Sequence, residues 1–443
     1  MIFDGSADVV ENPSRGTRHY IARSFKLKII EPVNAVEKLK DRSTVIFPGA
    51  CANPTRFYDA FIERVDGFRE LTICSGLSLG DYRFLNKGLG VNYRYVTWQA
   101  GIGLRRLFKD NDRRKISFVP LRLADLSRIV NRNGPIKPDT LVLQTSVPQD
   151  DGTVNLGISV GPNLHFLKQA RQIIAEFNVN MPVTNGNTKV SLADIDYAIE
   201  SDHPLATYET GMCDERESKI VDNVLSLVPE KAFVQLGIGS IPDKVLSGLG
   251  ALKNINLFSG MLSSGLVDYL NVADEVGQVV AGELAGGKTL YEICHLNPLI
   301  KMESIDKTHD VRKLAQLDNF ISINSTVEID LHGQCNGETL GAVQISGVGG
   351  SLDYIEAAAM SSGGKSILAL PSTTKDDAYS KIVGSFAAGS IVTTPRYCVD
   401  YVVTEYGIAQ LAGKSLWERS ESLIEIAHPK FREELVRNFN RLV

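Results

Sequence analysis

Two glycine-rich turns hold the residues of this 443-residue chain whose types and spacing best suit chemistry. In LGIGSIPDKVL (236–246) a strand pattern ends at Gly237, Gly239 allows a close backbone approach, and Pro242 suits the first turn of a helix. The free amides of such a helix terminus attract a phosphate or a developing oxyanion. Short glycine turns also serve packing alone, so this turn by itself does not define a site.

A second turn, in ISGVGGSLDYIEAAAM (345–360), places Gly347, Gly349 and Gly350 ahead of another expected helix. Two such turns in one half of the chain favour a nucleotide or thioester ligand. Their spacing is not the dinucleotide fingerprint GxGxxG, and the chain has no GxxxxGK[ST] phosphate loop. A kinase or a nicotinamide enzyme is therefore disfavoured.

A basic segment, GLRRLFKDNDRRK (103–115), is a third place where an anion could bind. Its cations are Arg105, Arg106, Lys109, Arg113, Arg114 and Lys115. A solvated helix face explains the same pattern more simply, and we prefer that interpretation.

Composition excludes several other classes of function. The net charge of −5 and the pI near 5.9 disfavour nucleic acid and anionic membranes as partners, and no stretch reaches the ~20 apolar residues of a membrane helix. The cysteines occur singly, which predicts a reducing, cytoplasmic location and no metal centre. They are Cys51, Cys74, Cys213, Cys294, Cys335 and Cys398.

The elements that must position these turns alternate between short apolar strands and amphipathic helices, which predicts an α/β fold with largely parallel sheets. The strand-like runs are STVIFPGA, TLVLQTSV, AFVQLGIG, NFISIN, SILALPS, SIVTTP and DYVVTEYG. The length favours two domains. We place a polar arm at 1–25, without the pattern of a secretory signal, a first domain at 26–205 and a second at 206–443.

The two domains share one local pattern. VIFPGACANPTRFYDAFIERV (45–65) and FVQLGIGSIPDKVLSGLG (233–250) both run strand, glycine, small residue, proline, helix. A duplication would explain this match, and so would two unrelated strand-turn-helix units.

Several longer motifs together resemble the acetyl-CoA hydrolase/transferase family, which includes 4-hydroxybutyrate CoA-transferases. They are VPQDDGTVNLGIS, MPVTNGNTKVSLADIDYAIESDHPL, LGIGSIPD, LHGQCNGETLG, SGVGGSLDY, GGKSILALPSTTK, VTTPRYCVDYVVTEYGIAQLAGKSLWERS and LIEIAHPKFREEL. The resemblance covers nearly the whole chain. It implies two tandem CoA-transferase-fold domains, an active site between them, and a cytoplasmic homodimer or higher oligomer.

The resemblance also implies ligands and the residues that contact them. Acyl-CoA and a small carboxylate or other acyl acceptor are the expected substrates, and no cofactor is permanently bound. The positions that match the family's CoA-binding residues are Gly237, Ile238, Gly239, Ser240, Ile241, Val327, Gly350 and Lys375.

One position departs from the family in a way that affects mechanism. Where family members read much like HSEMISDGVVDL, with a nucleophilic glutamate, this chain reads FSGMLSSGLVDY and has Gly260. A glutamyl-CoA thioester needs a side-chain carboxylate, which glycine lacks. Ser351 also stands where the family often has Gln. The weak replacement candidates are Cys51, Glu405, Glu338 and Asp353, with Cys51 more simply an inert buried thiol.

Three functions fit the sequence. The first, which we prefer, is acyl transfer or hydrolysis of an acyl-CoA without a glutamyl-CoA intermediate. The second is a CoA-transferase whose carboxylate comes from elsewhere in the chain. The third is a CoA-binding protein without catalysis, or a fold reused for another acyl-CoA reaction such as decarboxylation.

Overall fold

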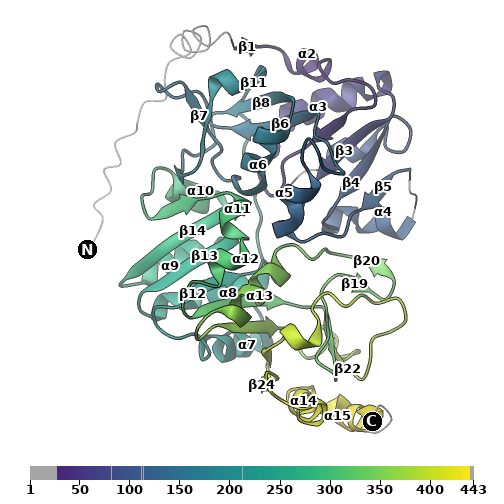
Figure 1. Cartoon of the computed structure of the whole chain (residues 1–443), viewed down its shortest axis with the longest axis vertical. Coiled ribbons are helices and arrows are strands. Elements are labelled where there is room, and N and C mark those ends of the chain that lie inside the picture. The colour runs from purple at the N-terminus through teal and green to yellow at the C-terminus, as the bar shows by residue number, and fades with distance from the viewer. Residues whose placement is uncertain (1–26, 81, 111, 113, 212, 440–443) are drawn as a thin grey trace.

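Two large, mainly parallel sheets stacked along the long axis dominate the computed structural model of the chain (Figure 1). The structure describes residues 27–439 except 81, 111, 113 and 212, so the polar arm expected at 1–25 lies outside the described residues. The expectation of an α/β fold with large parallel sheets and flanking helices is confirmed.

The first sheet has eight strands, and all of its pairings are parallel. In spatial order they are β1 (Lys28–Ile29), β11 (Tyr197–Ser201), β8 (Gln172–Asn178), β6 (Thr140–Thr145), β2 (Thr44–Ile46), β3 (Leu71–Ser75), β4 (Tyr93–Thr97) and β5 (Ile116–Phe118). The central strand β6, TLVLQT, is buried along its whole length, as expected for a parallel strand covered on both faces.

The second sheet has nine strands, and only its terminal strand β24 is antiparallel. In order they are β24 (Gly407–Gln410), β23 (Tyr401–Thr404), β21 (Lys365–Ala369), β16 (Phe320–Ser325), β12 (Phe233–Leu236), β13 (Ile255–Ser263), β14 (Val276–Ala285), β15 (Ile300–Met302) and β9 (Asn185–Gly186). Strand β9 comes from the first half of the chain, so the two halves share backbone hydrogen bonding in one sheet.

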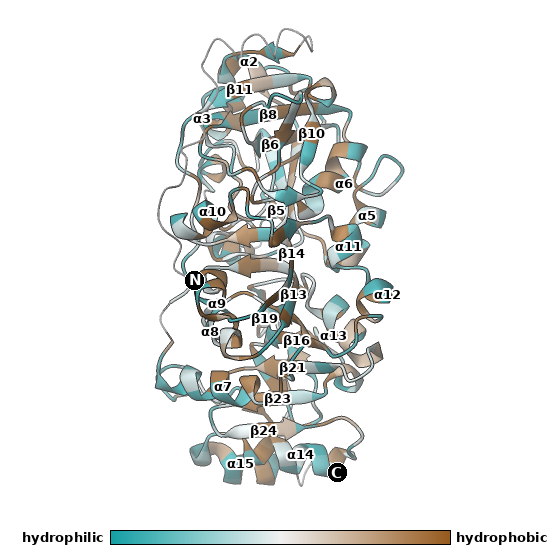
Figure 2. Cartoon of the chain, turned by 90° about the vertical axis from the view of Figure 1, so that its left-hand side faces the viewer, coloured by the Kyte–Doolittle hydropathy of each residue, from teal (hydrophilic) through white to brown (hydrophobic). Residues whose placement is uncertain are grey.

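Helices cover both faces of the second sheet (Figure 2). On one face are α8 (Ser240–Gly248), α9 (Gly265–Val272) and α10 (Lys288–Cys294). On the other are α11 (Ile305–Thr308), α12 (Val311–Leu314) and α13 (Ser351–Met360). Helix α7 (Glu215–Leu225) follows the polar connection between the halves, and Asp214 begins it with a capping box to Glu217.

One expected strand is wrong. SIVTTP (390–395) is an irregular segment in which only Thr394 makes an isolated bridge, to Cys335. Ile391 and Val392 in this run are 46% and 42% exposed, so the apolar letters there mark a surface rather than a buried strand. A short apolar run cannot distinguish these two cases.

Candidate functional site

Loops at the carboxyl ends of neighbouring strands bring several of the expected CoA-binding positions to one edge of the second sheet. Gly237 follows β12, Val327 follows β16 and Lys375 follows β21, and these three strands are adjacent in the order β21, β16, β12. Ligands of parallel α/β sheets bind outside the carboxyl ends of the strands. The arrangement therefore places these residues along one possible binding edge.

The first glycine turn has the geometry that its sequence predicts. Gly239 has φ +127°, which favours glycine, and it immediately precedes α8. Gly237, Ile238, Gly239 and Ser240 are half-buried, whereas the side chain of Ile241 is buried in the core. Any contact of Ile241 with a ligand in this conformation would therefore involve its backbone. The Ser240 hydroxyl donates to the Glu217 carboxylate at 2.8 Å.

The second glycine turn lies against the first half of the chain. The Leu123 amide donates to the Gly349 carbonyl at 2.9 Å. An ideal Cβ added to Gly347 would lie 2.4 Å from the Trp98 carbonyl oxygen, so no side chain fits there. The turn then enters α13 through Gly350. The glycines thus permit a close approach between the two halves at this site.

The space beside Gly260 is occupied by two aromatic side chains. An ideal Cβ at Gly260, in β13, would lie 2.7 Å from both Cε1 and Nε2 of His309 and 2.8 Å from the Tyr354 hydroxyl. An ideal Cβ at Gly350 would lie 2.5 Å from the same Nε2. The imidazole therefore fits between two glycines, and a glutamate at position 260 would collide with it unless the ring moved.

His309 is held by hydrogen bonds at both ring nitrogens. Thr308 Oγ1 donates its proton to the Ser304 carbonyl at 3.2 Å. Because that proton is used, Thr308 Oγ1 accepts a hydrogen bond from His309 Nδ1–H at 2.9 Å. His309 Nε2 is then an acceptor and receives the Tyr354 hydroxyl proton at 3.1 Å. Burial lowers the pKa of His309 to about 3, so the ring is neutral at physiological pH.

Sequence analysis missed His309 and Tyr354. His309 lies in SIDKTHDVRK, which has the charge pattern of a solvated helix end, and Tyr354 occupies a core position of α13. The two rings meet across 45 residues of chain, with ring centroids 4.9 Å apart. The only local signal was the absence of a side chain at Gly260.

Two of the carboxylates considered as replacements have partners of their own. Glu405 follows β23, four strands from β13, or about 19 Å away at the usual strand spacing. It accepts hydrogen bonds from the amide and hydroxyl of Ser372. Glu338 accepts from the Thr393 hydroxyl at 2.9 Å. Neither carboxylate lies at the Gly260 position.

Asp353 and Cys51 are also buried, and neither is activated as a nucleophile. Asp353 accepts from the Ala124 amide at 3.0 Å and so ties α13 to the first half, while burial raises its pKa to about 7. Burial raises the pKa of the Cys51 thiol to about 11. A thiol with so high a pKa carries almost no thiolate at pH 7.

Glu283 is a buried carboxyl that sequence analysis did not select. It lies in β14, opposite Met261 of β13, and forms an isolated bridge with Ser159 of the first half. Glu283 is only 8% exposed, and its Oε2 makes no hydrogen bond to any described residue. Burial raises its pKa from 4.5 to about 8.

The raised pKa of Glu283 predicts a specific pH dependence of stability. The folded state holds this proton longer than the unfolded state, so the Glu283 contribution is greatest below pH 4.5 and is lost as pH rises to about 8. Compared with wild type, Glu283→Gln should be more stable at pH 8 by roughly a few kcal/mol, since one pKa unit is about 1.4 kcal/mol. Urea unfolding of both proteins at pH 5 and 8 measures this difference. A gap that does not grow with pH would contradict it.

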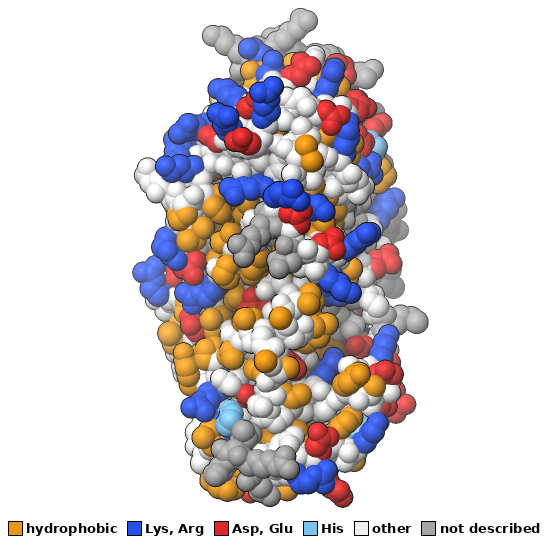
Figure 3. All heavy atoms as spheres, turned by 90° about the vertical axis from the view of Figure 1, so that its right-hand side faces the viewer, with side chains coloured by type: hydrophobic (Ala, Val, Ile, Leu, Met, Phe, Trp, Pro, Cys, Tyr) orange, Lys and Arg blue, Asp and Glu red, His pale blue; other side chains and the backbone are white. Residues whose placement is uncertain are grey.

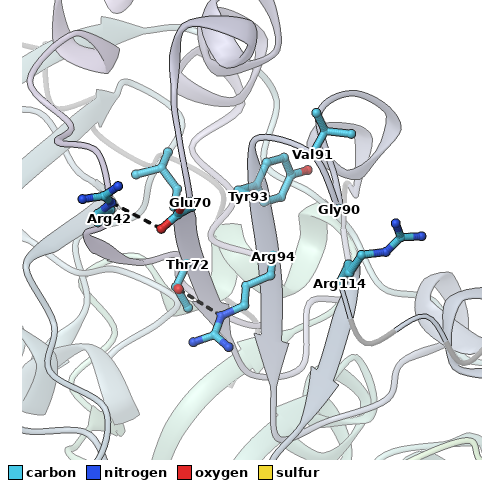
Figure 4. A pocket seen from close by; sticks show the side chains of 9 residues that line it. Arg42, Glu70, Thr72, Gly90, Val91, Tyr93, Arg94 and Arg114 are labelled. Carbon is cyan, nitrogen blue, oxygen red and sulfur yellow. Dashed lines mark hydrogen bonds and ion pairs between the residues drawn. The ribbon is translucent and has the colours of Figure 1, made fainter.

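One surface hollow lies away from this edge, whereas helix α4 (Arg105–Asp110) of the basic segment contacts β20 (Val343–Gln344), just before the second glycine turn. Helix α4 is short, with no buried residue, and Arg114 pairs with Asp112; Arg113 lies outside the described residues. The hollow in Figure 4 is lined by the amino ends of β3 and β4, opposite to their ligand-binding ends. Its Arg42 pairs with Glu70, and Arg94 bonds Thr72.

No described helix combines the length and the apolar character needed to cross a membrane.

Comparisons with known proteins agree with the motifs. The acetyl-CoA hydrolase/transferase N-terminal domain matches residues 14–208, and the corresponding C-terminal domain matches 286–439. A 4-hydroxybutyrate coenzyme A transferase of Clostridium kluyveri is 35% identical over 425 residues, which cover 94% of this chain and 98% of that relative. A succinyl-CoA:cyclohexane-1-carboxylate CoA transferase of Geobacter metallireducens is 30% identical, with coverages of 98% and 100%.

A solved structure extends the similarity to the fold. RipA from Yersinia pestis superposes with a TM-score of 0.88 at 27% identity, covering 96% of this chain and 99% of that one. The chain belongs to the acetyl-CoA hydrolase/transferase family of acyl-CoA enzymes.

Proposed function

We propose that this chain hydrolyses an acyl-CoA, or passes its acyl group directly to an acceptor, without a glutamyl-CoA intermediate. The supporting observation is that His309 and Tyr354 occupy the volume beside Gly260 where a catalytic carboxylate would lie. A simple loss of glutamate would leave a gap. A filled position with two hydrogen-bonding groups favours a different chemical step.

The hydrolytic step balances without a protein nucleophile. The oxygen of water bonds to the thioester carbonyl carbon, the C–S bond breaks, and CoA leaves as a thiolate that takes up the proton lost by water. The products are a carboxylic acid and CoA. For direct transfer, the hydroxyl or amine of an acceptor takes the place of water and gives its proton to the thiolate. A carboxylate acceptor displaces CoA thiolate to form a mixed anhydride, and the thiolate then attacks the acceptor's carbonyl carbon, which gives the acceptor's CoA thioester and releases the original acyl group as a carboxylate.

The residues at this edge have the properties that such a step needs. His309 Nε2 and the Tyr354 hydroxyl are hydrogen-bonded to each other, so a bound substrate must first break this bond. Nε2 then accepts from the attacking group, and the hydroxyl donates to the developing oxyanion. The free amides at the start of α13 lie beside the same glycine, Gly350. We assign CoA to the positions Gly237, Ile238, Gly239, Ser240, Ile241, Val327, Gly350 and Lys375.

A CoA-transferase with a relocated carboxylate is less well supported. Its nucleophile must be ionised and must reach the thioester. Glu405 and Glu338 are engaged elsewhere, and burial keeps Glu283 largely protonated at pH 7. Each of these properties lowers nucleophilicity.

Intact-protein mass spectrometry with a panel of short acyl-CoAs tests the proposal. We expect CoA release without any acyl or CoA adduct, and, for hydrolysis in ¹⁸O-water, one labelled oxygen in the acid product. An adduct on a defined carboxylate would instead establish a covalent transferase. Binding without CoA release would establish a non-catalytic protein or a different acyl-CoA reaction, such as decarboxylation.

We also propose that the chain forms a homo-oligomer and works in a reducing, cytoplasmic setting. Exposed apolar side chains gather on the face seen in Figure 3. The exposed large apolar residues of the chain include Ile102, Leu340, Ile391 and Val392. The Ile391 amide donates to Thr339 Oγ1, so two of these segments lie together. A second copy of the chain is the occupant we assign to this surface. All six cysteines are free thiols.

A further inference from the structure

One oxygen of the Glu283 carboxyl, Oε2, is buried near the proposed site without a hydrogen-bond partner among the described residues. The ideal Cβ of Gly161 would lie 3.2 Å from Oε1, and Ser159 hydrogen-bonds the carboxyl. Among the described ion pairs none includes Glu283. A buried polar atom without a partner costs about 1–3 kcal/mol, so its retention calls for an explanation.

The surroundings of this carboxyl belong to both halves of the chain. Cys51, from the turn after β2, interacts electrostatically with Glu283 and hydrogen-bonds the Tyr291 side chain of α10. The Tyr291 hydroxyl donates to the Ala206 carbonyl at 2.8 Å. Glu283 therefore lies in a seam where the carboxyl ends of strands from both sheets meet. Small substrates of α/β enzymes are bound in such seams.

Strand register places Glu283 next to the proposed reaction centre. Between the pairs Ser259–Ala281 and Met261–Glu283, Gly260 lies beside Gly282. An ideal Cβ at Gly282 would be 2.9 Å from the Gly260 carbonyl oxygen and 3.5 Å from Gly161 Cα. Gly161 thus contacts both the backbone beside Gly260 and the Glu283 carboxyl.

The carboxyl and the dyad of His309 and Tyr354 lie on opposite faces of the sheet. Side chains alternate along a strand, so the Glu283 and Met261 side chains leave the sheet on the face opposite to the Gly260 position, which faces His309. Met261 is only half-buried, which leaves this side of the strands accessible near their carboxyl ends. A thioester beside Gly260 could therefore extend its acyl chain over the sheet edge toward Glu283.

We propose that Glu283 is a specificity-determining residue that binds a hydrogen-bond donor, an ammonium or hydroxyl group, on the acyl chain of the substrate. This inference rests on the proposed function, because it takes the ligand to be an acyl-CoA. When an ammonium group on the acyl chain binds, the carboxyl loses its proton and Oε2 accepts from the ammonium. A hydroxyl group donates to Oε2 of the neutral carboxyl, whose proton is then on Oε1. An unsubstituted acyl chain of the same length leaves the carboxyl unsatisfied, and an anionic chain brings a second acid beside the first.

Non-hydrolysable CoA thioethers separate recognition from catalysis. The probes are S-propyl-CoA, S-(3-hydroxypropyl)-CoA, S-(3-aminopropyl)-CoA and S-(2-carboxyethyl)-CoA, with affinities measured by calorimetry on the full chain. We expect the aminopropyl or hydroxypropyl probe to bind at least about 10-fold more tightly than the propyl probe, as for one new charge-assisted or neutral hydrogen bond. The Glu283→Leu variant should remove this preference, and Glu283→Gln should weaken the ammonium preference most.

The control is a second buried glutamate in the first sheet. Glu176→Gln should keep the wild-type order of affinities, since Glu176 bonds the Phe57 amide within the first half. Equal binding of all probes, tightest binding of the carboxyethyl probe, or an unchanged order in Glu283→Leu would overturn the inference. If neither Glu283 variant folds, the order of probe affinities in the wild-type protein decides whether the inference holds. A donor preference without turnover of the matching thioesters would refute the proposed function and leave this inference standing.

Discussion

The Gly260→Glu variant will form no glutamyl-CoA thioester and will be less stable than wild type. Position 260 has no left-handed φ, so its backbone accepts a side chain, but the added Cβ would lie 2.7 Å from the His309 ring. Overpacking of this kind costs roughly 1–3 kcal/mol. Thermal unfolding measures the loss of stability, and intact-mass spectrometry after incubation with acyl-CoA measures the adduct.

A compensated variant makes this test informative. Gly260→Glu combined with His309→Ala removes the ring that occupies the glutamate position, so part of the lost stability should return. If the carboxylate then reaches a thioester, the combined variant alone will show the CoA adduct. If the single variant Gly260→Glu forms the adduct and is as stable as wild type, then position 260 is open to a side chain. The packing of His309 and Tyr354 beside Gly260 would then have no functional role.

The His309→Gln variant should lose on the order of 100-fold in kcat, the size typical of losing one hydrogen-bonding group positioned for the transition state, while KM for acyl-CoA changes little. Tyr354→Phe should act in the same direction, because it removes the hydroxyl that bonds Nε2. Steady-state CoA release measures both parameters. If kcat/KM falls in both variants only because KM rises, the two residues act in substrate binding instead.

His165→Gln is the matched control for this prediction. His165 is also buried, and its Nε2 bonds the Val130 carbonyl at 2.7 Å within the first half of the chain. A loss of stability without a change in kcat is expected there. If His165→Gln and His309→Gln reduce kcat equally, the His309 effect reflects folding and not chemistry.

Much of the fold was predictable because it is encoded locally. The buried runs that form β6, β12 and β16 are short, apolar and closed by turn residues, and Gly239 appears where a helix start needs a positive φ. The same rule predicted a strand at SIVTTP and was wrong there, because an exposed apolar segment and a buried strand can have the same composition. Strand β9 could not be expected, since two residues carry no strand signal of their own.

The sequence indicated the site only through a side chain that is absent. Gly260 is informative in the sequence because a carboxylate is absent there, but nothing nearby indicates what replaces it. His309, Tyr354 and Glu283 acquire their chemistry from burial and from partners distant in sequence. Desolvation sets their protonation states, and desolvation follows from tertiary packing that a charge pattern does not report.

Backbone links between the halves limit how the protein can move. Asn185 pairs in register with Lys301 through β9 and β15, Ser159 bridges Glu283, and Arg122 bridges Gly349. Wide jaw-like opening about a hinge would have to break all of these hydrogen bonds in each turnover. Substrate entry and product release must therefore proceed through local displacement of loops and side chains around a rigid frame, and any slow opening step will belong to those loops.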